Sequence, residues 1–155
     1  MKRTFAFILV FYSLISFAQI DEPNWLTFEQ LEQKMIEKPK KVMIHFYADW
    51  CNYCKKMEKV VYLKPKILEE LNSNYYVIKF NVESEDAVEF GGRVFLNLNT
   101  GKNRRAKHQI AELLAIKNGE SLTLPAVLFF NEDFILEKRL HRYIPPKELL
   151  TLLQE

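Results

Sequence analysis

Residues 41–55 read KVMIHFYADWCNYCK, and the fold is decided in this stretch. Its first eight residues are rich in β-branched and aromatic side chains, which predicts a buried strand. Cys51 and Cys54 follow directly, with two residues between them. Apolar residues then recur at helical spacing, so a helix is expected over residues 50–62. The sequence therefore places a cysteine pair at the start of a helix that follows a buried strand.

The spacing of the two cysteines favours redox chemistry over structural cross-linking. A disulfide that closes so short a loop constrains the unfolded chain very little. A helix N-terminus offers unpaired N–H groups and a partial positive charge, and both stabilise a thiolate. We therefore expect Cys51 to be the nucleophile that attacks disulfides, and Cys54 to be the resolving thiol that releases the product.

Two other uses of a cysteine pair fit the sequence less well. A structural zinc site needs about four ligands, whereas the chain has two cysteines, and His45, His108 and His141 show no ligand spacing. A c-type haem attachment needs histidine directly after the second cysteine, where this chain has Lys55. Neither a metal nor another cofactor is therefore expected.

The rest of the chain predicts alternating helices and strands. Helices are expected at residues 28–38, 65–71, 106–117 and 146–153, and strands at residues 75–82, 126–130 and 134–140. Thr27 and Gln30 fit a capping box at the first helix. The short turn at residues 131–133 favours an antiparallel hairpin, whereas strands separated by helices favour parallel crossovers. The predicted fold class is α/β, with a mixed central sheet of about four strands flanked by helices.

The first 18 residues have the layout of a secretory signal peptide. A basic start precedes an uncharged apolar run, and residues 16–18 match a small-x-small cleavage site before Gln19. An uncleaved membrane anchor is the alternative, but the apolar run is shorter than the roughly 20 residues that a spanning helix needs. We therefore expect a signal peptide at residues 1–18 and a single domain at residues 19–155.

The charge balance does not favour a nucleic-acid partner. The chain has 22 Lys and Arg and 20 Asp and Glu, and removing Lys2 and Arg3 with the signal peptide makes the two counts equal. A local basic cluster remains, and it is typical of a solvated loop and helix start: Lys102, Arg104, Arg105 and Lys107. The composition is 48% hydrophobic, which suffices for a core. With the signal peptide cleaved, the mature form is expected to be soluble.

The stretch HFYADWCNYCK at residues 45–55 resembles the active-site stretch of thioredoxins. It is more similar still to secreted bacterial thioredoxin-family proteins. It also resembles the C-terminal domain of the membrane thiol–disulfide interchange reductase, where the stretch continues with Lys and Glu, as Lys55 and Glu58 do here. The resemblance covers roughly residues 25–153 and implies the thioredoxin fold.

The resemblance also implies where a substrate binds. The family places a cis-proline opposite the cysteine pair, and Pro125, just before a predicted strand, matches that position. In the family, the backbone of the residue before this proline pairs with the substrate chain, and here that residue is Leu124. Trp50, Leu124 and Pro125 are therefore the expected substrate-binding residues.

The sequence departs from the thioredoxin pattern at two positions near the cysteines. Thioredoxins carry a buried acid where this chain has His45, which either tunes the thiols or is a core histidine satisfied by hydrogen bonds. Glu58 lies four residues after Cys54 and could serve as a substitute proton relay or as a salt-bridged surface residue. The helix proline found five residues after the second cysteine of thioredoxins is missing, so a straight helix is expected until Tyr62.

The segment from Glu83 to Leu124 is longer than the equivalent connection in thioredoxins. It predicts an inserted loop before the cis-proline, with a short β-hairpin around residues 94–96. Long loops often carry specificity, so the segment is either a decoration or a rim that recognises a substrate or partner. His108, within it, is expected to be a surface or capping residue.

The resemblance implies an exported thiol–disulfide oxidoreductase that is periplasmic or secreted. Its partners would be protein thiols and disulfides, and the continuation with Lys55 and Glu58 favours the reducing direction, with re-reduction by a membrane redox partner. The alternative is a binding or chaperone module that keeps the fold and has no redox turnover. The presence of both cysteines argues against that module.

Overall fold

The computed structural model describes residues 22–116, 119 and 121–155, and the predicted signal peptide lies outside them. The helices are α1 (Phe28–Glu37), α2 (Asn52–Lys56), the π-helix η1 (Met57–Val61), α3 (Pro65–Asn74), α4 (Gln109–Ala115) and α5 (Pro146–Leu153). The strands are β1 (Trp25–Leu26), β2 (Lys41–Tyr47), β3 (Tyr75–Asn81), β4 (Val88–Phe90), β5 (Arg93–Phe95), β6 (Ala126–Phe130) and β7 (Leu136–Leu140).

A five-stranded mixed sheet in the order β1-β3-β2-β6-β7 forms the centre of the molecule. Strands β1 and β2 both pair with β3 in parallel, whereas β6 is antiparallel to β2 and β7 is antiparallel to β6. The α/β class and the mixed sheet are therefore confirmed. The expected number of about four strands was one too few, because β1 has only two residues and so leaves no periodic pattern in the sequence.

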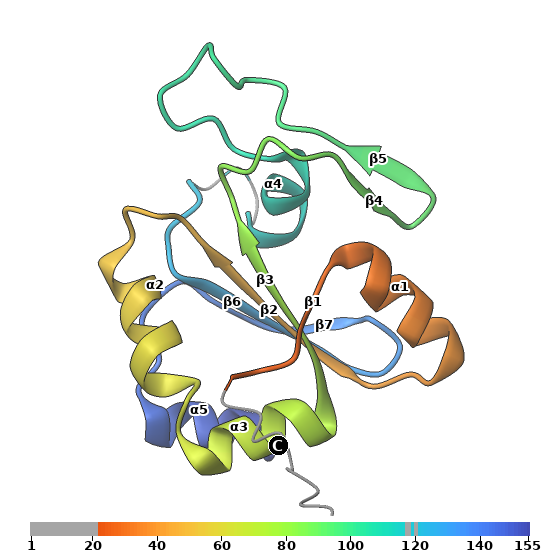
Figure 1. Cartoon of the computed structure of the whole chain (residues 1–155), viewed down its shortest axis with the longest axis vertical. Coiled ribbons are helices and arrows are strands. Elements are labelled where there is room, and N and C mark those ends of the chain that lie inside the picture. The colour runs from red at the N-terminus through yellow and green to blue at the C-terminus, as the bar shows by residue number, and fades with distance from the viewer. Residues whose placement is uncertain (1–21, 117–118, 120) are drawn as a thin grey trace, which may run out of the picture.

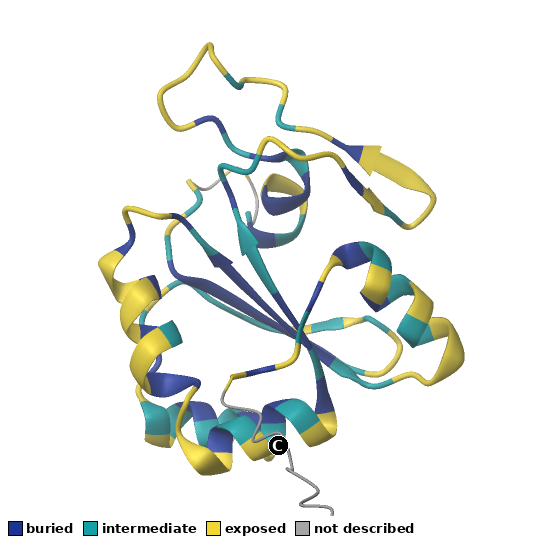
Figure 2. Cartoon of the chain, viewed as in Figure 1, coloured by how far each residue is buried: buried dark blue, intermediate teal, exposed yellow. Residues whose placement is uncertain are grey.

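The helices cover both faces of the sheet (Figure 1). Alternate side chains of β2 point to opposite faces, so Ile44 and Phe46 pack with residues of α1 and α4, whereas Met43 packs with residues of η1, α3 and α5. Burial in Figure 2 follows the same arrangement, since the central strands β2 and β6 are mostly dark blue and the outer helix faces are yellow. Two cores thus lie on the two sides of one sheet.

Local sequence signals explain the helix starts. Thr27 Oγ1 accepts from the N–H of Gln30 at 3.2 Å and Gln30 Oε1 accepts from the N–H of Thr27 at 3.0 Å, which confirms the capping box of α1. Prolines stand at the first turn of α3 and α5, where the missing N–H costs nothing. The hairpin β4–β5 is also present, and its turn uses Gly91 and Gly92, both at positive φ.

Two helix predictions need correction. The helix expected to run straight to Tyr62 changes after Lys56 into η1, where the N–H of Tyr62 donates to the carbonyl of Met57 at 3.0 Å. The wider π turn lets Val61 and Tyr62, adjacent in sequence, both be fully buried. The helix expected over 106–117 is shorter, because His108 caps α4, which runs from Gln109 to Ala115.

Candidate active site

The cysteine pair lies where the chain leaves β2 and enters α2. The N–H of Cys51 donates to the carbonyl of Ala48 at 2.9 Å, which closes the turn after the strand. Cys51 is the N-cap of α2, and its Sγ accepts from the N–H of Cys54 at 3.2 Å. The two residues form a disulfide, with a Cα–Cα distance of 5.2 Å. The Cys51 sulfur therefore accepts a hydrogen bond from a helix N-terminus, as expected for a stabilised thiolate.

The two cysteines differ in their access to solvent. Cys51 keeps 5% of its surface exposed and Cys54 keeps none. Two large aromatic residues beside them are open to solvent, Trp50 at 46% and Tyr53 at 61%. Cys51 is therefore the more accessible residue of the pair and lies beside two exposed aromatic side chains.

Strand pairing brings the predicted substrate-binding proline to the same edge of the sheet. The peptide bond between Leu124 and Pro125 is cis. Pro125 directly precedes β6, which pairs antiparallel with β2 from Phe46–Ala126 to Val42–Phe130. The start of β6 therefore lies beside the end of β2, where the chain turns toward Cys51.

His45 lies fully buried on the face of β2 that packs against η1. Its Nδ1 is 2.9 Å from the hydroxyl of Tyr62. Its Nε2 has no hydrogen-bond partner and lies 3.9 Å from the Glu58 carboxylate. A proton on Nε2 faces that carboxylate and leaves Nδ1 free to accept from Tyr62, so this tautomer suits both sides of the ring.

Burial controls the charge of this histidine. Desolvation is the largest cause, and the Lys79 ammonium the second, of a fall in the pKa of His45 from 6.5 to about 3. Burial likewise raises the pKa of Tyr62 well above its ordinary value. At neutral pH the pair is therefore an uncharged imidazole and an uncharged phenol, in contrast to the carboxylate that a thioredoxin-type acid would supply.

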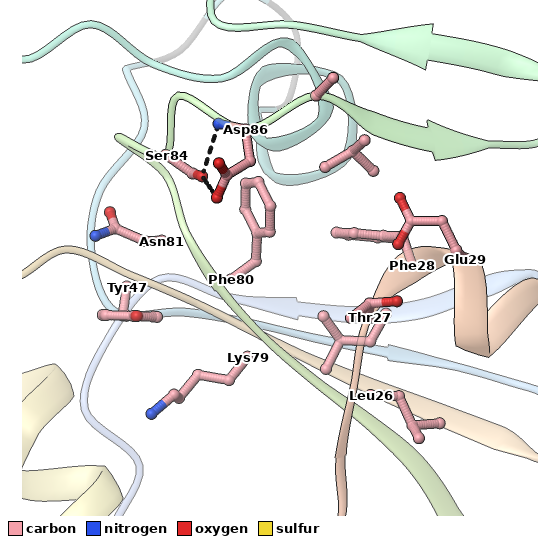
Figure 3. A pocket seen from close by; sticks show the side chains of 13 residues that line it. Leu26, Thr27, Phe28, Glu29, Tyr47, Lys79, Phe80, Asn81, Ser84 and Asp86 are labelled. Atoms are coloured by element: carbon pink, nitrogen blue, oxygen red, sulfur yellow. Dashed lines mark hydrogen bonds between the residues drawn. The ribbon is translucent and has the colours of Figure 1, made fainter.

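Glu58 connects this buried pair to solvent. Its carboxylate accepts from Lys79 Nζ at 3.0 Å, and the two side chains are 23% and 30% exposed. Lys79 and Tyr47 also line a cleft of about 500 Å³ that opens along the edge of β3 (Figure 3). The cleft exists because β1 pairs with β3 only as far as Ile78, whereas β2 pairs with it to Asn81.

Sequence reasoning missed the contacts that hold Trp50. The indole N–H donates to the Glu83 carboxylate at 2.8 Å, and the guanidinium of Arg105 lies 4.2 Å from the centre of the Trp50 ring. Both partners come from the segment between residues 83 and 124. The basic cluster at residues 102–107 was the available signal, but nothing in the sequence shows that it folds toward Trp50.

His108, expected at the surface or as a cap, is a buried cap. Its Nδ1 accepts from the N–H of Ile110 at 3.2 Å, and its Nε2 donates to the carbonyl of Asp86 at 3.0 Å. It therefore joins the start of α4 to the chain after β3.

Over residues 22–116, 119 and 121–155, no three His, Cys, Asp or Glu side chains gather as a metal site. Nor does any helix in these ranges have the length and apolar character needed to cross a membrane.

A helix-capping CxxC pair at the end of a mixed sheet, with a cis-proline at the same edge, defines the class of thioredoxin-fold redox domains. The chain belongs to the thioredoxin-like domain family, whose model matches residues 28–155. It is similar to the thiol:disulfide interchange protein DsbD of Photorhabdus laumondii, with 30% identity over 120 residues, which are 77% of this chain and 16% of that protein. The chain is thus homologous to thiol–disulfide oxidoreductases but spans about a sixth of this relative.

Solved structures show the same fold. A thioredoxin from Thermus thermophilus aligns with a TM-score of 0.57 at 19% identity, covering 86% of this chain and 85% of that one. The reduced C-terminal domain of DsbD from Neisseria meningitidis aligns with a TM-score of 0.51 at 16% identity, covering 80% of this chain and 88% of that one. Both likenesses confirm the thioredoxin fold predicted from residues 45–55.

Proposed function

We propose that this chain is an exported thiol–disulfide oxidoreductase that reduces disulfides in other proteins. The observation that carries the proposal is the asymmetry of the cysteine pair. Cys51 caps a helix and keeps some exposure, whereas Cys54 is fully buried behind it. An attacking thiol must reach its target, and a resolving thiol must reach only the attacking one.

The proposed reaction transfers two electrons from the cysteine pair to a substrate disulfide. The Cys51 thiolate attacks one substrate sulfur, forming a mixed disulfide and releasing the other sulfur as a thiolate. Cys54 then loses its proton and attacks the Cys51 sulfur, which re-forms the disulfide that the structure contains and frees the second substrate thiolate. The two substrate thiolates take up two protons, so the substrate is reduced and the pair is oxidised.

The neighbours of the pair fit distinct parts in this reaction. Trp50 and the backbone of Leu124, next to Pro125, would hold the substrate chain beside Cys51. Glu58, one helical turn after Cys54 and partly exposed, would pass the proton of Cys54 to solvent. His45 would act on the thiols as a neutral group, and Tyr62 would hold its ring in place.

The charge state of His45 supports the reducing direction. A cationic imidazole near the pair would stabilise a thiolate and so make the disulfide a stronger oxidant. The pKa of His45, lowered to about 3 by burial, removes that cation at neutral pH. The name of the relatives, thiol:disulfide interchange protein, fits exchange with protein thiols and disulfides. Re-reduction by a membrane partner is proposed on the resemblance at Lys55 and Glu58.

Export is proposed on the sequence of residues 1–18 and on the two-cysteine composition. A periplasmic or secreted location would place the pair where disulfides of other proteins form. N-terminal sequencing of the exported protein tests the proposed export. The mature chain should begin at Gln19. A mature chain that still begins at Met1 would contradict the proposal.

Trapping tests the reaction. Cys54→Ser should hold substrate proteins as mixed disulfides on Cys51, released by reductant and separated by diagonal electrophoresis. The matched control is Cys51→Ser, which keeps one thiol but should trap nothing. Equal trapping by both variants, or no insulin reduction by the reduced wild type, would contradict the assignment and favour a binding module.

Equilibration with glutathione tests the direction. A potential near roughly −270 mV supports reduction, whereas one near about −120 mV supports oxidation.

A further inference from the structure

We infer that residues 97–108, here called the basic loop, form a cationic rim that selects substrates with acidic residues beside their disulfide. The inference rests on the proposed disulfide exchange and names the substrate class for it. Four cations and no acids lie in the basic loop: Lys102, Arg104, Arg105 and Lys107. All but Lys107 are in the exposed class. No hydrogen bond or ion pair among the described residues neutralises any of these four side chains.

The basic loop is tied down at both ends. Leu96 donates its N–H to Gln109 Oε1 at 2.8 Å, and the N–H of Gln109 donates to the carbonyl of Leu96 at 3.0 Å. Asn97 Nδ2 donates to the carbonyls of Ser84 and Ala106 at 3.1 and 3.0 Å. The loop therefore has a defined base on the segment that follows β3.

Arg105 links this loop to the cysteine pair. Its guanidinium lies over the ring of Trp50, the residue directly before Cys51, and the Glu83 carboxylate accepts a hydrogen bond from the indole N–H. Arg105 is thus a positioning residue, and its charge is placed over the aromatic surface that a substrate must meet.

The helix that carries the cysteines is also basic on its exposed side. Lys55, Lys56 and Lys59 are exposed on α2 and η1, and the one acid in this stretch, Glu58, already pairs with Lys79. In Figure 1 the basic loop lies at the end of the molecule opposite α3 and α5. Acids also lie at the base of this loop, because Asn97 and His108 bond to the carbonyls of Ser84 and Asp86, beside Glu83 and Glu85. The excess of cations is therefore confined to the basic loop itself.

A rim of one sign raises the encounter rate with the opposite sign and makes that rate depend on salt. Three disulfide-bridged peptides of one length would test this, flanked by aspartates, by lysines or by neutral residues. Pre-reduced full-length protein supplies the electrons in a single turnover followed by stopped flow. At low ionic strength the acidic peptide should react about tenfold faster than the basic one, and the ratio should approach one at about 1 M salt.

Two variants that each lose three positive charges distinguish an effect of the basic loop from an effect of the net charge of the protein. Lys102→Gln/Arg104→Gln/Lys107→Gln should lower the preference for the acidic peptide by several fold. It leaves the Arg105–Trp50 contact in place and should keep the rate with the neutral peptide. The control removes three exposed lysines elsewhere and should keep the wild-type preference: Lys38→Gln/Lys66→Gln/Lys147→Gln.

The outcomes distinguish this inference from the proposed function. Equal rates with all three peptides, or the same loss of preference in both variants, would overturn the inference alone. No reaction with any peptide or with insulin would overturn the proposed function as well. Binding to vesicles of anionic phospholipid that requires the basic loop, without a peptide preference, would show that the rim serves a lipid surface and would also overturn the inference.

Discussion

Replacing His45 should remove a large part of the pH dependence of stability. The folded chain resists protonation of this imidazole, because burial lowers its pKa from 6.5 to about 3. The unfolded chain does not, so below pH 6.5 it binds a proton that the folded chain lacks. The stability that depends on the neutral His45 is therefore fully present above its unfolded-state pKa of 6.5. It is lost as the pH falls from 6.5 toward the folded-state pKa of about 3.

The magnitude follows from the two pKa values. Between pH 7.5 and pH 5 the unfolded chain gains about 2 kcal/mol from protonating this one group, since each pH unit below 6.5 contributes about 1.4 kcal/mol. Urea unfolding at both pH values measures the difference. In His45→Leu, or in His45→Gln if the leucine variant does not fold, the decrease in unfolding free energy should be smaller by that amount.

A second variant tests the cause. Tyr62→Phe removes the hydrogen bond to Nδ1 but keeps His45 buried. It should lower stability by about 1 kcal/mol at pH 7.5 and retain the decrease toward pH 5, because burial is the larger cause. The reasoning is refuted if His45→Leu has the same pH dependence as the wild type, or if Tyr62→Phe alone abolishes it.

Three further predictions concern single contacts. Glu58→Gln should slow the release of mixed disulfides by about tenfold or more while leaving their formation unchanged, which quenched-flow trapping would resolve; equal slowing of both steps would contradict a relay. Thr27→Ala should cost about 1 kcal/mol in urea unfolding through loss of the capping box, and Gln30→Ala is the companion that should cost a similar amount. His108→Ala should lower the free energy of unfolding by about 2 kcal/mol, since a helix cap and the hydrogen bond to the Asp86 carbonyl are lost together. Amide hydrogen exchange should rise first in α4. A uniform rise across the sheet would show that the effect is not local.

The sequence predicts the fold around the cysteines well because the signals there are local. A strand, a helix start and a hairpin depend on neighbouring residue types, so β2, the capping box and the short hairpin that includes β5 could be predicted directly. Pro125 needed the family resemblance, since nothing in residues 123–126 alone indicates a cis bond. The π-helix carried no residue signal, and the missing proline suggested a straight helix instead.

The site was predictable in its chemistry but not in its contacts. Cys51 and Cys54 could be assigned roles from spacing, and those roles stay predictions until they are tested. The contact between His45 and Tyr62 joins a strand to the end of a π-helix, and Arg105 meets Trp50 from a distant loop. Such contacts depend on how elements pack, which residue types and spacing do not encode.

The closed base of the basic loop fixes where the loop leaves and rejoins the rest of the fold. Leu96 and Gln109 are joined by two hydrogen bonds, one in each direction. The two ends of the loop are therefore held together whatever residues lie between them. Doubling the length of a flexible loop costs only about 0.6 kcal/mol. Residues 98–104 could therefore diverge or lengthen between related chains while Arg105 still contacts Trp50 beside Cys51, which would vary the surface around one cysteine pair.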